Sequence, residues 1–456
     1  MPISRARAAA FEILLKVARE AAYASELLHS TRLAKLSSAD HGLATELVMG
    51  CLRWQSWLDR RIANASSQKL GRLDAEILVA LRLGLYQLQF LSRIPARAAI
   101  FESVQLVKAA RKTSAAPFVN AVLRKLVSNS ASAAHPAPDS PAEALLAQIR
   151  DSRDAAALAE NSAHPEWLVQ RWVDRYGLDA ARQICAHNQC TPHTSVHLYD
   201  DRVLADLAES HIQLAPGLLL SSARIVLSGD VTQTRAYRER LISIQDEASQ
   251  LVALLVGDGQ NFLDCCAAPG LKTALLANRN PHATVFACEL HPHRARLLRA
   301  LSLQPNIRVV AADARQLPFS TSFDRILADV PCSGTGTLAR NPEIKWRLTP
   351  QDLHDLHVRQ FAILQSALAH LSPGGRLVYS TCSLEPEENE ALVKAALEGA
   401  GQFEVLNCRG ELDRLRQLGE LASRSPHSLL DGPFLRTIPG VHPCDGFFAA
   451  IIQRNS

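Results

Sequence analysis

The chain has 456 residues, of which 47 % are hydrophobic and 21 % charged, and its formal net charge is +4. This composition is typical of a soluble globular protein, and the length suggests roughly three domains. No uncharged apolar stretch approaches the ~18 residues of a membrane-spanning helix, which excludes a membrane-embedded class.

The N-terminus and the cysteines indicate a cytoplasmic protein. The first 20 residues form an amphipathic helical pattern, because Glu12 and Lys16 interrupt the apolar run that a signal peptide needs. The ten cysteines contain no CxxC pair and do not cluster with the histidines. We therefore expect reduced thiols, no metal site and no disulfide framework.

Positive charge is concentrated at the start of the chain. Residues 1–142 hold 19 Lys and Arg against 10 Asp and Glu, whereas the remaining residues hold 30 against 35. A basic N-terminal third on a near-neutral remainder favours a polyanionic partner. A solvated helical surface would carry the same charge pattern, so charge alone leaves both interpretations open.

Residues 1–128 are predicted to be all-helical. Apolar residues recur at helical spacing in three segments, residues 75–91, 98–112 and 118–127. The first of these stops before Pro95, as helices commonly do. Residues 129–142 are rich in Pro, Ser and Ala with almost no large apolar side chain, which is typical of a linker.

Residues 143–235 are predicted to form a small α+β module. A helical pattern over residues 166–177 leads into shorter alternating stretches, for example TSVHLYD at residues 194–200. We expect this module to contact the same polyanion as the helical region.

From residue 236 to the end, strands and helices are predicted to alternate. Five short apolar runs are separated mostly by helical patterns: NFLDCCA, ATVFACEL, NIRVVAAD, FDRILADVP and GRLVYSTC. This order predicts a doubly wound, Rossmann-like α/β sheet, whose ligands bind outside the carboxyl ends of the strands.

Four of these strands end in an acidic residue, and the four acids are expected to converge on one crevice at the switch point of the sheet. A single acidic residue at a strand end is commonly a helix cap, so the prediction of a shared crevice rests on the occurrence of all four. The four residues are Asp264, Glu289, Asp313 and Asp329.

The loop after the first strand, DCCAAPGLKT at residues 264–273, predicts a nucleoside site. Its small residues and Gly270 allow a tight turn that brings backbone N–H groups close to a ligand. It is neither a GxGxxG fingerprint nor a Walker A loop. Glu289 follows Asp264 by 25 residues, near the position where a carboxylate takes ribose hydroxyls in nucleotide-binding sheets. A nucleoside cofactor is expected, and a dinucleotide is not.

Two cysteines occupy the ends of the last two predicted strands. Cys332 follows the fourth strand in a glycine-rich loop, and Cys382 follows the fifth, 50 residues later. Adjacent strands would bring both thiols into the same crevice. Either cysteine alone would more commonly be a small buried hydrophobe, but a pair beside an acid favours nucleophilic chemistry.

The motifs DCCAAPGLKT, DVPCSGTG and YSTCS together resemble those of the RNA 5-methylcytosine methyltransferases that use S-adenosylmethionine. The N-terminal region, with ADHGLATELVMGCLRW and FVNAVLRKL, is similar to the NusB-like domain of the bacterial 16S rRNA methyltransferases in that family. HPEWLVQRWVDRYG is similar to their middle domain. The resemblance therefore implies a NusB-like helical RNA-binding domain (1–128), a linker (129–142), an α+β RNA-binding module (143–235) and a class I methyltransferase domain (236–456).

The resemblance also implies a role for each site residue. Glu289 would hold the cofactor ribose, Asp313 the adenine edge, and Asp329 would lie between the cofactor and the target base. The loop around the methionine part of the cofactor would consist of Cys266, Ala267, Ala268, Pro269, Gly270, Leu271 and Lys272. This chain departs from the family in having Leu271 in place of a second glycine and Glu289 where aspartate is common.

The implied reaction needs a thiolate, because carbon 5 of cytosine becomes nucleophilic only after sulfur adds to carbon 6. Spacing leaves open which thiol attacks, and the resemblance selects Cys382, with Cys332 acting as, or positioning, the base that removes the carbon 5 proton. A protonated Asp329 would meet the charge developing on the ring. Arg340 and Lys345 are candidate phosphate contacts, with solvated surface as the equal alternative.

The resemblance thus implies a monomeric cytoplasmic enzyme that acts on 16S rRNA and on neither DNA nor membranes. Two alternatives share parts of the pattern: a tRNA cytosine-C5 methyltransferase, and a non-catalytic NusB-type RNA-binding factor. The second would need neither thiol, yet the sequence keeps both. A nucleotide-dependent dehydrogenase is disfavoured, because the glycine fingerprint is absent.

Overall fold

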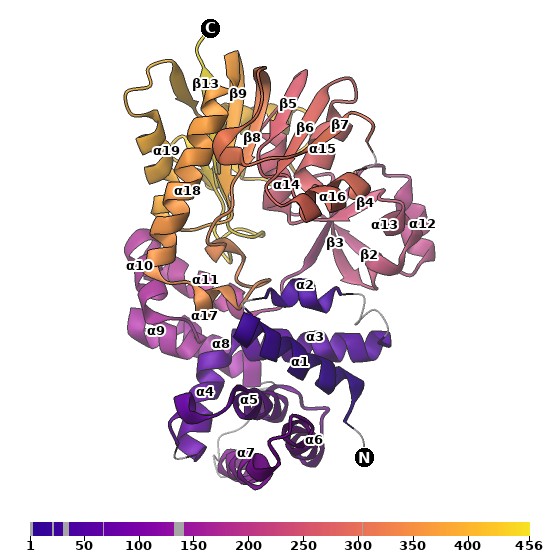
Figure 1. The fold of residues 1–456 in the computed structure, drawn as a ribbon, viewed down its shortest axis with the longest axis vertical. Helices are drawn as coiled ribbons and strands as arrows, with labels where there is room; N and C mark the ends of the chain where they lie inside the picture. The colour runs from indigo at the N-terminus through magenta and orange to yellow at the C-terminus, as the bar shows by residue number, and fades with distance from the viewer. Residues whose placement is uncertain (1–2, 21, 31–35, 67, 132–140, 303) are drawn as a thin grey trace. The chain divides into compact units, whose positions relative to one another are not determined.

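The computed structural model describes residues 3–456, except residues 21, 31–35, 67, 132–140 and 303. The chain divides into two compact units, shown with their elements in Figure 1. The first unit comprises Met1–Thr191 with Leu338–Arg347, and the second comprises Pro192–Thr337 with Leu348–Ser456. Most of the predicted linker, residues 132–140, lies outside the described residues.

The N-terminal part of the first unit is helical, as predicted for residues 1–128. Ser37 caps one helix by accepting a hydrogen bond from the backbone N–H of Asp40. The helices up to the predicted linker are α1 Arg5–Glu20, α2 Ala24–Leu28, α3 Ser38–Arg53, α4 Gln55–Ser66, α5 Ala75–Phe90, α6 Ala96–Ala109 and α7 Ala116–Ala131.

Four further helices belong to the first unit. They are α8 Pro141–Arg150, α9 Ala155–Ser162, α10 Glu166–Tyr176 and α11 Leu178–Gln189. The segment that the sequence assigns to one middle module, residues 143–235, is therefore divided: its helical start packs in the first unit, and its strands lie in the second. Helical periodicity located α10, but periodicity carries no information about which core a helix joins.

The segment 338–347, with α17 Ile344–Arg347, folds as part of the helical unit although the chain on both sides of it belongs to the second unit. The Lys345 ammonium donates to the backbone oxygen of Arg53 at 2.9 Å, and the Trp346 indole N–H donates to that of Leu52 at 2.6 Å. Lys345 is only 1 % exposed, and burial holds the pKa of its ammonium well below the usual range.

The expectation that Lys345 contacts phosphate is therefore wrong, because its side chain is enclosed by protein. A single sequence shows that a lysine carries a charge, but it does not show whether the aliphatic part of that side chain is buried. Arg340, the other candidate, is half-buried in the same segment.

The second unit begins with a small antiparallel sheet in the order β2-β3-β1-β4. Its strands are β1 Thr194–Leu198, β2 Gln213–Pro216, β3 Ala223–Ser228 and β4 Ile242–Ile244, and its helices are α12 Val203–Glu209 and α13 Arg235–Arg238. Val196, Leu207 and Ile242 lie in its apolar core. Strand β4 lies beyond residue 235, so the sheet extends past the expected end of the module.

The larger sheet contains the five predicted strands, all parallel, in the order β9-β8-β5-β6-β7. They are β5 Asn261–Asp264, β6 Thr284–Glu289, β7 Ile307–Ala311, β8 Phe323–Asp329 and β9 Leu371–Thr381. The chain builds outward from β5 through β6 to β7 and then returns to the other side of β5. This reversal is the topological switch point, where ligands of such sheets bind.

An antiparallel extension that the sequence analysis did not predict continues the sheet beyond β9. Strand β13 Phe448–Arg454 pairs with β9, and it in turn pairs with β10 Phe403–Leu406 and β12 Phe434–Arg436, which pairs with β11 Leu430–Asp431. The apolar run FFAAIIQR forms β13, whose Ala449, Ala450 and Ile451 are buried.

Helices cover both faces of this sheet, which confirms the doubly wound class. Alternate residues of β9 show the division: Val378 packs with α14 Glu247–Leu254, α15 Leu271–Arg279 and α20 Cys408–Gln417, whereas Tyr379 packs with α18 Pro350–Ala369 and α19 Glu390–Leu397. Helix α16 Pro292–Leu301 packs through Leu298 against Ala287 of β6.

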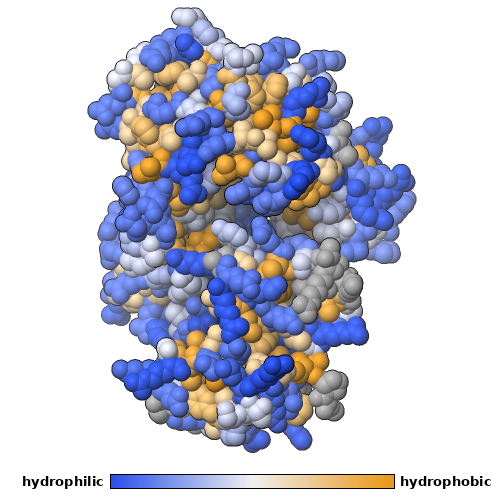
Figure 2. All heavy atoms as spheres, viewed as in Figure 1, coloured by the Kyte–Doolittle hydropathy of each residue, from blue (hydrophilic) through white to orange (hydrophobic). Residues whose placement is uncertain are grey.

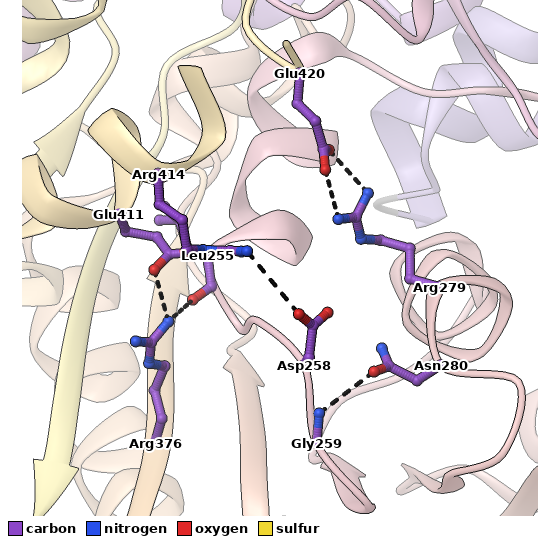
Figure 3. A network of polar contacts seen from close by, with 9 residues as sticks. All are labelled: Leu255, Asp258, Gly259, Arg279, Asn280, Arg376, Glu411, Arg414 and Glu420. Atoms are coloured by element: carbon purple, nitrogen blue, oxygen red, sulfur yellow. Dashed lines mark hydrogen bonds and ion pairs between the residues drawn. The ribbon is translucent and has the colours of Figure 1, made fainter. Parts of the chain in front are cut away.

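An ionic network joins elements near the amino ends of the strands (Figure 3). Glu411 on α20 accepts hydrogen bonds from Arg376 of β9 at 2.9 Å and from Arg414 at 2.8 Å. The Arg376 guanidinium also donates to the backbone oxygen of Leu255. Arg279 of α15 forms a separate ion pair with Glu420 at 2.6 Å. The network thus links α14 and α20 to β9, and the separate pair joins α15 to the segment that follows α20.

Removing the buried carboxylate of this network should destabilise the second unit. The Glu411 side chain is only 5 % exposed, so Glu411→Ala leaves two guanidinium groups without their shared acceptor. We expect a loss of about 2 kcal/mol in the free energy of unfolding, measured by urea denaturation. The matched variant Glu420→Ala, at a more accessible pair, should cost less than about 1 kcal/mol. Equal losses would contradict this ranking.

Within the described residues, no helix is both long enough and apolar enough to cross a membrane. On the face drawn in Figure 2, hydrophobic residues form patches that are interrupted by hydrophilic ones.

Candidate functional site

A pocket of about 610 Å³ lies at the carboxyl ends of the parallel strands, where the sequence analysis expected the ligand. Residues from β5, β6, β7, β8 and β9 or their following loops all line it. Among them are seven of the expected site residues: Cys266, Ala268, Glu289, Asp313, Asp329, Cys332 and Cys382.

The loop after β5 is fixed by Asp264, the last residue of that strand. Its buried carboxylate accepts a hydrogen bond from the Thr273 hydroxyl at 2.7 Å and one from the backbone N–H of Cys266 at 3.3 Å. Burial raises the pKa of Asp264 to about 6. Asp264 does not line the pocket. Its carboxylate holds the conformation of the loop, and the neighbouring residues are the ones that face a ligand.

Gly270 allows the same loop to turn into α15. Its φ of +108° lies in the left-handed region, and a Cβ atom there would lie 2.5 Å from the Leu298 side chain. Leu271, which replaces the second glycine of the family pattern, begins α15 and does not line this pocket. The replacement therefore adds no side chain to the pocket wall.

Glu289 and Asp313 present carboxylates on the β6 and β7 side of the pocket. Glu289 is buried, and its Oε1 accepts a hydrogen bond from the backbone N–H of His291 at 2.9 Å. Asp313 lies after β7 and forms an ion pair with Arg315 at 2.6 Å, and this hydrogen bond lowers the pKa of the Asp313 carboxyl. Two carboxylates on one side of a strand-end pocket suit the hydroxyl and amino groups of a nucleoside.

Asp329 at the end of β8 is held by two donors. The Lys272 ammonium donates to Oδ2 at 2.7 Å, and the Ser380 hydroxyl donates to Oδ1 at 2.7 Å. Burial alone would lower the pKa of Lys272, but the adjacent Asp329 carboxylate outweighs it and the net effect raises that pKa. Both Asp329 oxygens act as acceptors in these contacts, and the proton-donor role that the sequence analysis expected for Asp329 stays a prediction.

The two thiols meet at the centre of the pocket. Cys332 Sγ and Cys382 Sγ lie 3.3 Å apart, close enough for an S–H donor on one sulfur to contact the other. The hydrogen bond to Cys382, reinforced by burial, raises the pKa of Cys332 well above its usual range. Either sulfur can be the donor in this contact. Cys382 is among the groups that raise the pKa of Lys272, so the ammonium lies within electrostatic range of the Cys382 sulfur.

A buried carboxylate, Glu388, holds the loops of both cysteines. It accepts hydrogen bonds from the backbone N–H of Ser333, at 2.8 Å, and from the hydroxyls of Ser333 and Ser383, the residues that follow the two cysteines. Gln360 of α18 donates to the same carboxylate at 2.8 Å. Glu388 is fully buried and lies in the turn Pro386–Glu388 that precedes α19. One side chain thus fixes the spacing of the two sulfurs.

Two backbone hydrogen bonds also hold the loops of Cys332 and Cys382 in place. The N–H of Gly336 donates to the carbonyl of Cys382 at 2.9 Å, and the N–H of Gly446, just before β13, donates to the carbonyl of Gly336 at 2.8 Å. A Cβ atom on Gly336 would lie 2.1 Å from the Gly446 oxygen, so this approach requires glycine. The antiparallel extension therefore supports the Cys332 loop.

The structure brings together most of the expected site and separates a part of it. Lys272 contacts Asp329, whereas Ala267 is buried against Ala287 and Leu298. Pro269, Gly270 and Leu271 line a different pocket. Sequence reasoning missed Glu388, Ser333, Ser380 and Ser383, and also the pocket residues His291, Arg294 and Arg359. All three serines lie within the quoted motifs DVPCSGTG and YSTCS, whose pattern gives no sign of their hydrogen-bond partners.

Comparisons with known proteins agree with this architecture. Residues 251–453 match the family model "16S rRNA methyltransferase RsmB/F", and residues 4–128 match that of the NusB family. The chain is 32 % identical to the "Probable ribosomal RNA small subunit methyltransferase B" of Bacillus subtilis, covering 98 % of each chain. It is 34 % identical to the "Ribosomal RNA small subunit methyltransferase B" of Pseudomonas putida, covering 92 % of each.

Two solved structures share the fold. The crystal structure of PH0851 superposes with a TM-score of 0.78 at 20 % identity and covers 100 % of both chains. That of NSun6 from Pyrococcus horikoshii with SFG gives a TM-score of 0.55 at 17 % identity, covering 65 % of this chain and 99 % of the other.

The doubly wound sheet, its strand-end pocket and these matches define the class: a methyltransferase with an α/β catalytic domain and a NusB-family helical domain. The chain belongs to the 16S rRNA methyltransferase RsmB/F family. The resemblance to the bacterial 16S rRNA methyltransferase RsmB, also called Sun or Fmu, is thereby confirmed, together with the fold class and the assignment as an enzyme.

Proposed function

We propose that this enzyme transfers a methyl group from S-adenosylmethionine to carbon 5 of a cytosine in 16S rRNA, through a transient bond between Cys382 and carbon 6. The observation that carries the proposal is the thiol pair: two sulfurs 3.3 Å apart in one strand-end pocket, with the pKa of Cys332 raised by its contact with Cys382. Such a pair supplies a nucleophile and a second proton-transfer group in one pocket.

The residues present fit S-adenosylmethionine. Glu289 would hold the ribose hydroxyls and Asp313 the adenine edge, while Cys266 and Ala268 leave room for backbone groups to approach the methionine part. The family match supports the same cofactor. When bound, it supplies an electrophilic methyl group, and the protein supplies the remaining chemistry.

The first step is addition of the Cys382 sulfur to carbon 6 of cytosine, which pushes electrons onto carbon 5 and leaves negative charge toward N3 and O2. The Lys272 ammonium, which is partly buried and paired with Asp329, supplies positive charge for that ring. Asp329 orients Lys272 and is an acceptor for the exocyclic amino group of cytosine. The electron pair on carbon 5 then forms the new bond to the methyl group.

The second step removes the carbon 5 proton and expels Cys382 as a thiolate. Bond formation by Cys382 removes the hydrogen bond that raises the pKa of Cys332, so the Cys332 thiol can release its proton to solvent before it acts as a base. The Cys332 thiolate then takes the carbon 5 proton, and the carbon 6–sulfur bond breaks as the ring double bond re-forms. The products are 5-methylcytosine and the demethylated cofactor.

Replacing Cys332 with alanine should trap the covalent intermediate. Without the base, the methylated ring keeps its bond to Cys382, and labelled RNA should remain attached to the protein on a denaturing gel. The double variant Cys332→Ala with Cys382→Ala is the control and should form no adduct. An adduct in Cys382→Ala but not in Cys332→Ala would reverse the two roles.

The substrate assignment is supported by the printed names of the relatives, which are ribosomal RNA methyltransferases, and by the NusB-family match. The excess of Lys and Arg in residues 1–142 would give the helical unit salt-dependent affinity for RNA. We propose a monomer acting in the cytoplasm on a cytosine that is unpaired or flipped out of its stack.

Bisulfite sequencing of rRNA and tRNA tests the substrate in a strain that lacks this protein. The expected result is one 16S rRNA cytosine that becomes unmodified and regains its methyl group when the wild-type gene is restored. Loss of a tRNA methylcytosine with unchanged rRNA would instead support the tRNA alternative. Unchanged methylation of both RNAs would overturn the proposal.

A further inference from the structure

A second pocket, of about 470 Å³, lies beside the cofactor loop. The small sheet module contributes Tyr199, Tyr237, Arg238 and Arg240, and the loop contributes Pro269 and Leu271. It shares no lining residue with the first pocket, although Ala268 lines one and the next residue, Pro269, lines the other. Both pockets lie in the second unit, so one loop separates them.

Arginines of the small module differ in whether they have a carboxylate partner. Away from this pocket, Arg202 pairs with Asp200, Arg224 with Asp201 and Arg235 with Glu239. The two arginines that line the pocket, Arg238 and Arg240, have no carboxylate partner among the residues that the structure describes. Their charges are therefore available to an anion.

Arg240 occupies a position that local structure would give to glycine. It follows α13 with a φ of +58°, in the left-handed region where helices commonly end at glycine. Its Nη1 is buried and has no hydrogen-bond partner within the described part of the chain. Backbone strain and an unpaired buried donor both lower stability. A residue that combines them is typical of a binding site.

The rest of the pocket wall suits a nucleobase. The Tyr237 ring is 36 % exposed, and Tyr199 lies on the same pocket with the apolar side chains of Ile242, Leu271 and Leu301. Aromatic rings next to guanidinium groups are the usual elements that hold single-stranded RNA, with the base on the ring and the phosphate on the cation.

We propose that this pocket binds a nucleotide of the RNA substrate other than the target cytosine, with its base against Tyr237 and its phosphate on Arg238 and Arg240. The inference rests on the proposed function, because it takes RNA to be the substrate. It also gives Leu271 a role: the side chain that replaces the family glycine forms part of a nucleotide-binding wall.

Binding of in vitro transcribed 16S rRNA, measured by filter retention at several KCl concentrations, tests the proposal. Arg240→Gly should raise the Kd about tenfold and make the salt dependence less steep by roughly 0.7–0.9 in the slope of log Kd against log salt. Arg238→Met should act in the same direction. The matched control Arg235→Met removes an equal charge from the same helix, at an exposed ion pair, and should change the Kd less than about twofold.

Two further measurements separate binding from structural support. Arg240→Gly should be at least as thermally stable as the wild type, because it removes both the strained backbone and the unpaired donor. Its affinity for S-adenosylmethionine, measured by calorimetry, should stay unchanged. Tyr237→Ala should weaken rRNA binding, and Tyr237→Phe should restore it, since stacking needs only the ring.

Wild-type Kd and salt slope in both Arg240→Gly and Arg238→Met would overturn the proposal. A lower Tm of Arg240→Gly with an unchanged slope in Arg238→Met would also overturn it, since the arginines would then support the fold. Failure of the wild-type protein to bind or methylate any rRNA would instead remove the proposed function itself, so the two failures are distinguishable.

Discussion

Cys382→Ala should lose methyl transfer by about 10⁴-fold or more, because no other group in the pocket can add to carbon 6 with the same geometry. The sulfur lies at the end of β9, 3.3 Å from Cys332 and within electrostatic range of Lys272. Incorporation of labelled methyl groups from S-adenosylmethionine into 16S rRNA of a strain lacking the enzyme measures the loss.

The matched control for this variant is Cys190→Ala. Cys190 is an exposed thiol at the end of α11 in the helical unit, so its removal should leave the rate within about twofold of wild type. Cys382→Ala should keep its affinity for the cofactor, which separates lost chemistry from lost binding. Turnover of Cys382→Ala at the wild-type rate would rule out the covalent mechanism.

Glu388→Gln should lower kcat by roughly 10²-fold while leaving the KM for S-adenosylmethionine unchanged, because misplacement of reacting groups by about 1 Å has an effect of that size. The carboxylate accepts hydrogen bonds from both cysteine loops and from Gln360, whereas an amide offers one acceptor oxygen and turns a donor toward the serine hydroxyls. The spacing of the two sulfurs then loses its fixed anchor.

The appropriate readout is the rate of adduct formation in the Cys332→Ala background. If Glu388 positions Cys382, adding Glu388→Gln should slow formation of the adduct, whereas a variant that only lowers stability should leave that rate unchanged below its melting temperature. Glu398→Gln, an exposed glutamate at the end of α19, is the matched control and should have no effect. Unchanged adduct kinetics would assign Glu388 to the fold alone.

The catalytic sheet was predictable because its central strands are buried on both faces and therefore appear as short apolar runs. The acids and cysteines stand at the ends of those runs, so Asp329, Cys332 and Cys382 could be assigned to one crevice before any geometry was known. Of the antiparallel strands after residue 400, β10, β11 and β12 have only four, two and three residues. β13 has seven residues, but its antiparallel pairing with β9 follows from contacts distant in sequence.

Three features depend on such distant contacts and could not be obtained from a single sequence. The acidic run EPEEN has the pattern of a helix start, and Glu388 is distinguished from the equally buried Glu385 only by its hydrogen bonds to the loops of both cysteines. The pairing of Lys272 with Asp329 joins residues 57 positions apart. The enclosure of Lys345 depends on backbone oxygens of α3, nearly 300 residues earlier in the chain.

The membership of residues 338–347 in the helical unit limits how this enzyme can be dissected. The chain leaves the catalytic unit six residues after Cys332 and returns to it at Leu348. A fragment starting at residue 236 would contain every proposed catalytic group yet lose the helices that enclose Lys345 and accept its hydrogen bond, so residues 338–347 would have no core to pack in. The N-terminal helices are thus needed for residues 338–347, which follow the Cys332 loop, to fold. Experiments on this enzyme should therefore use the whole chain.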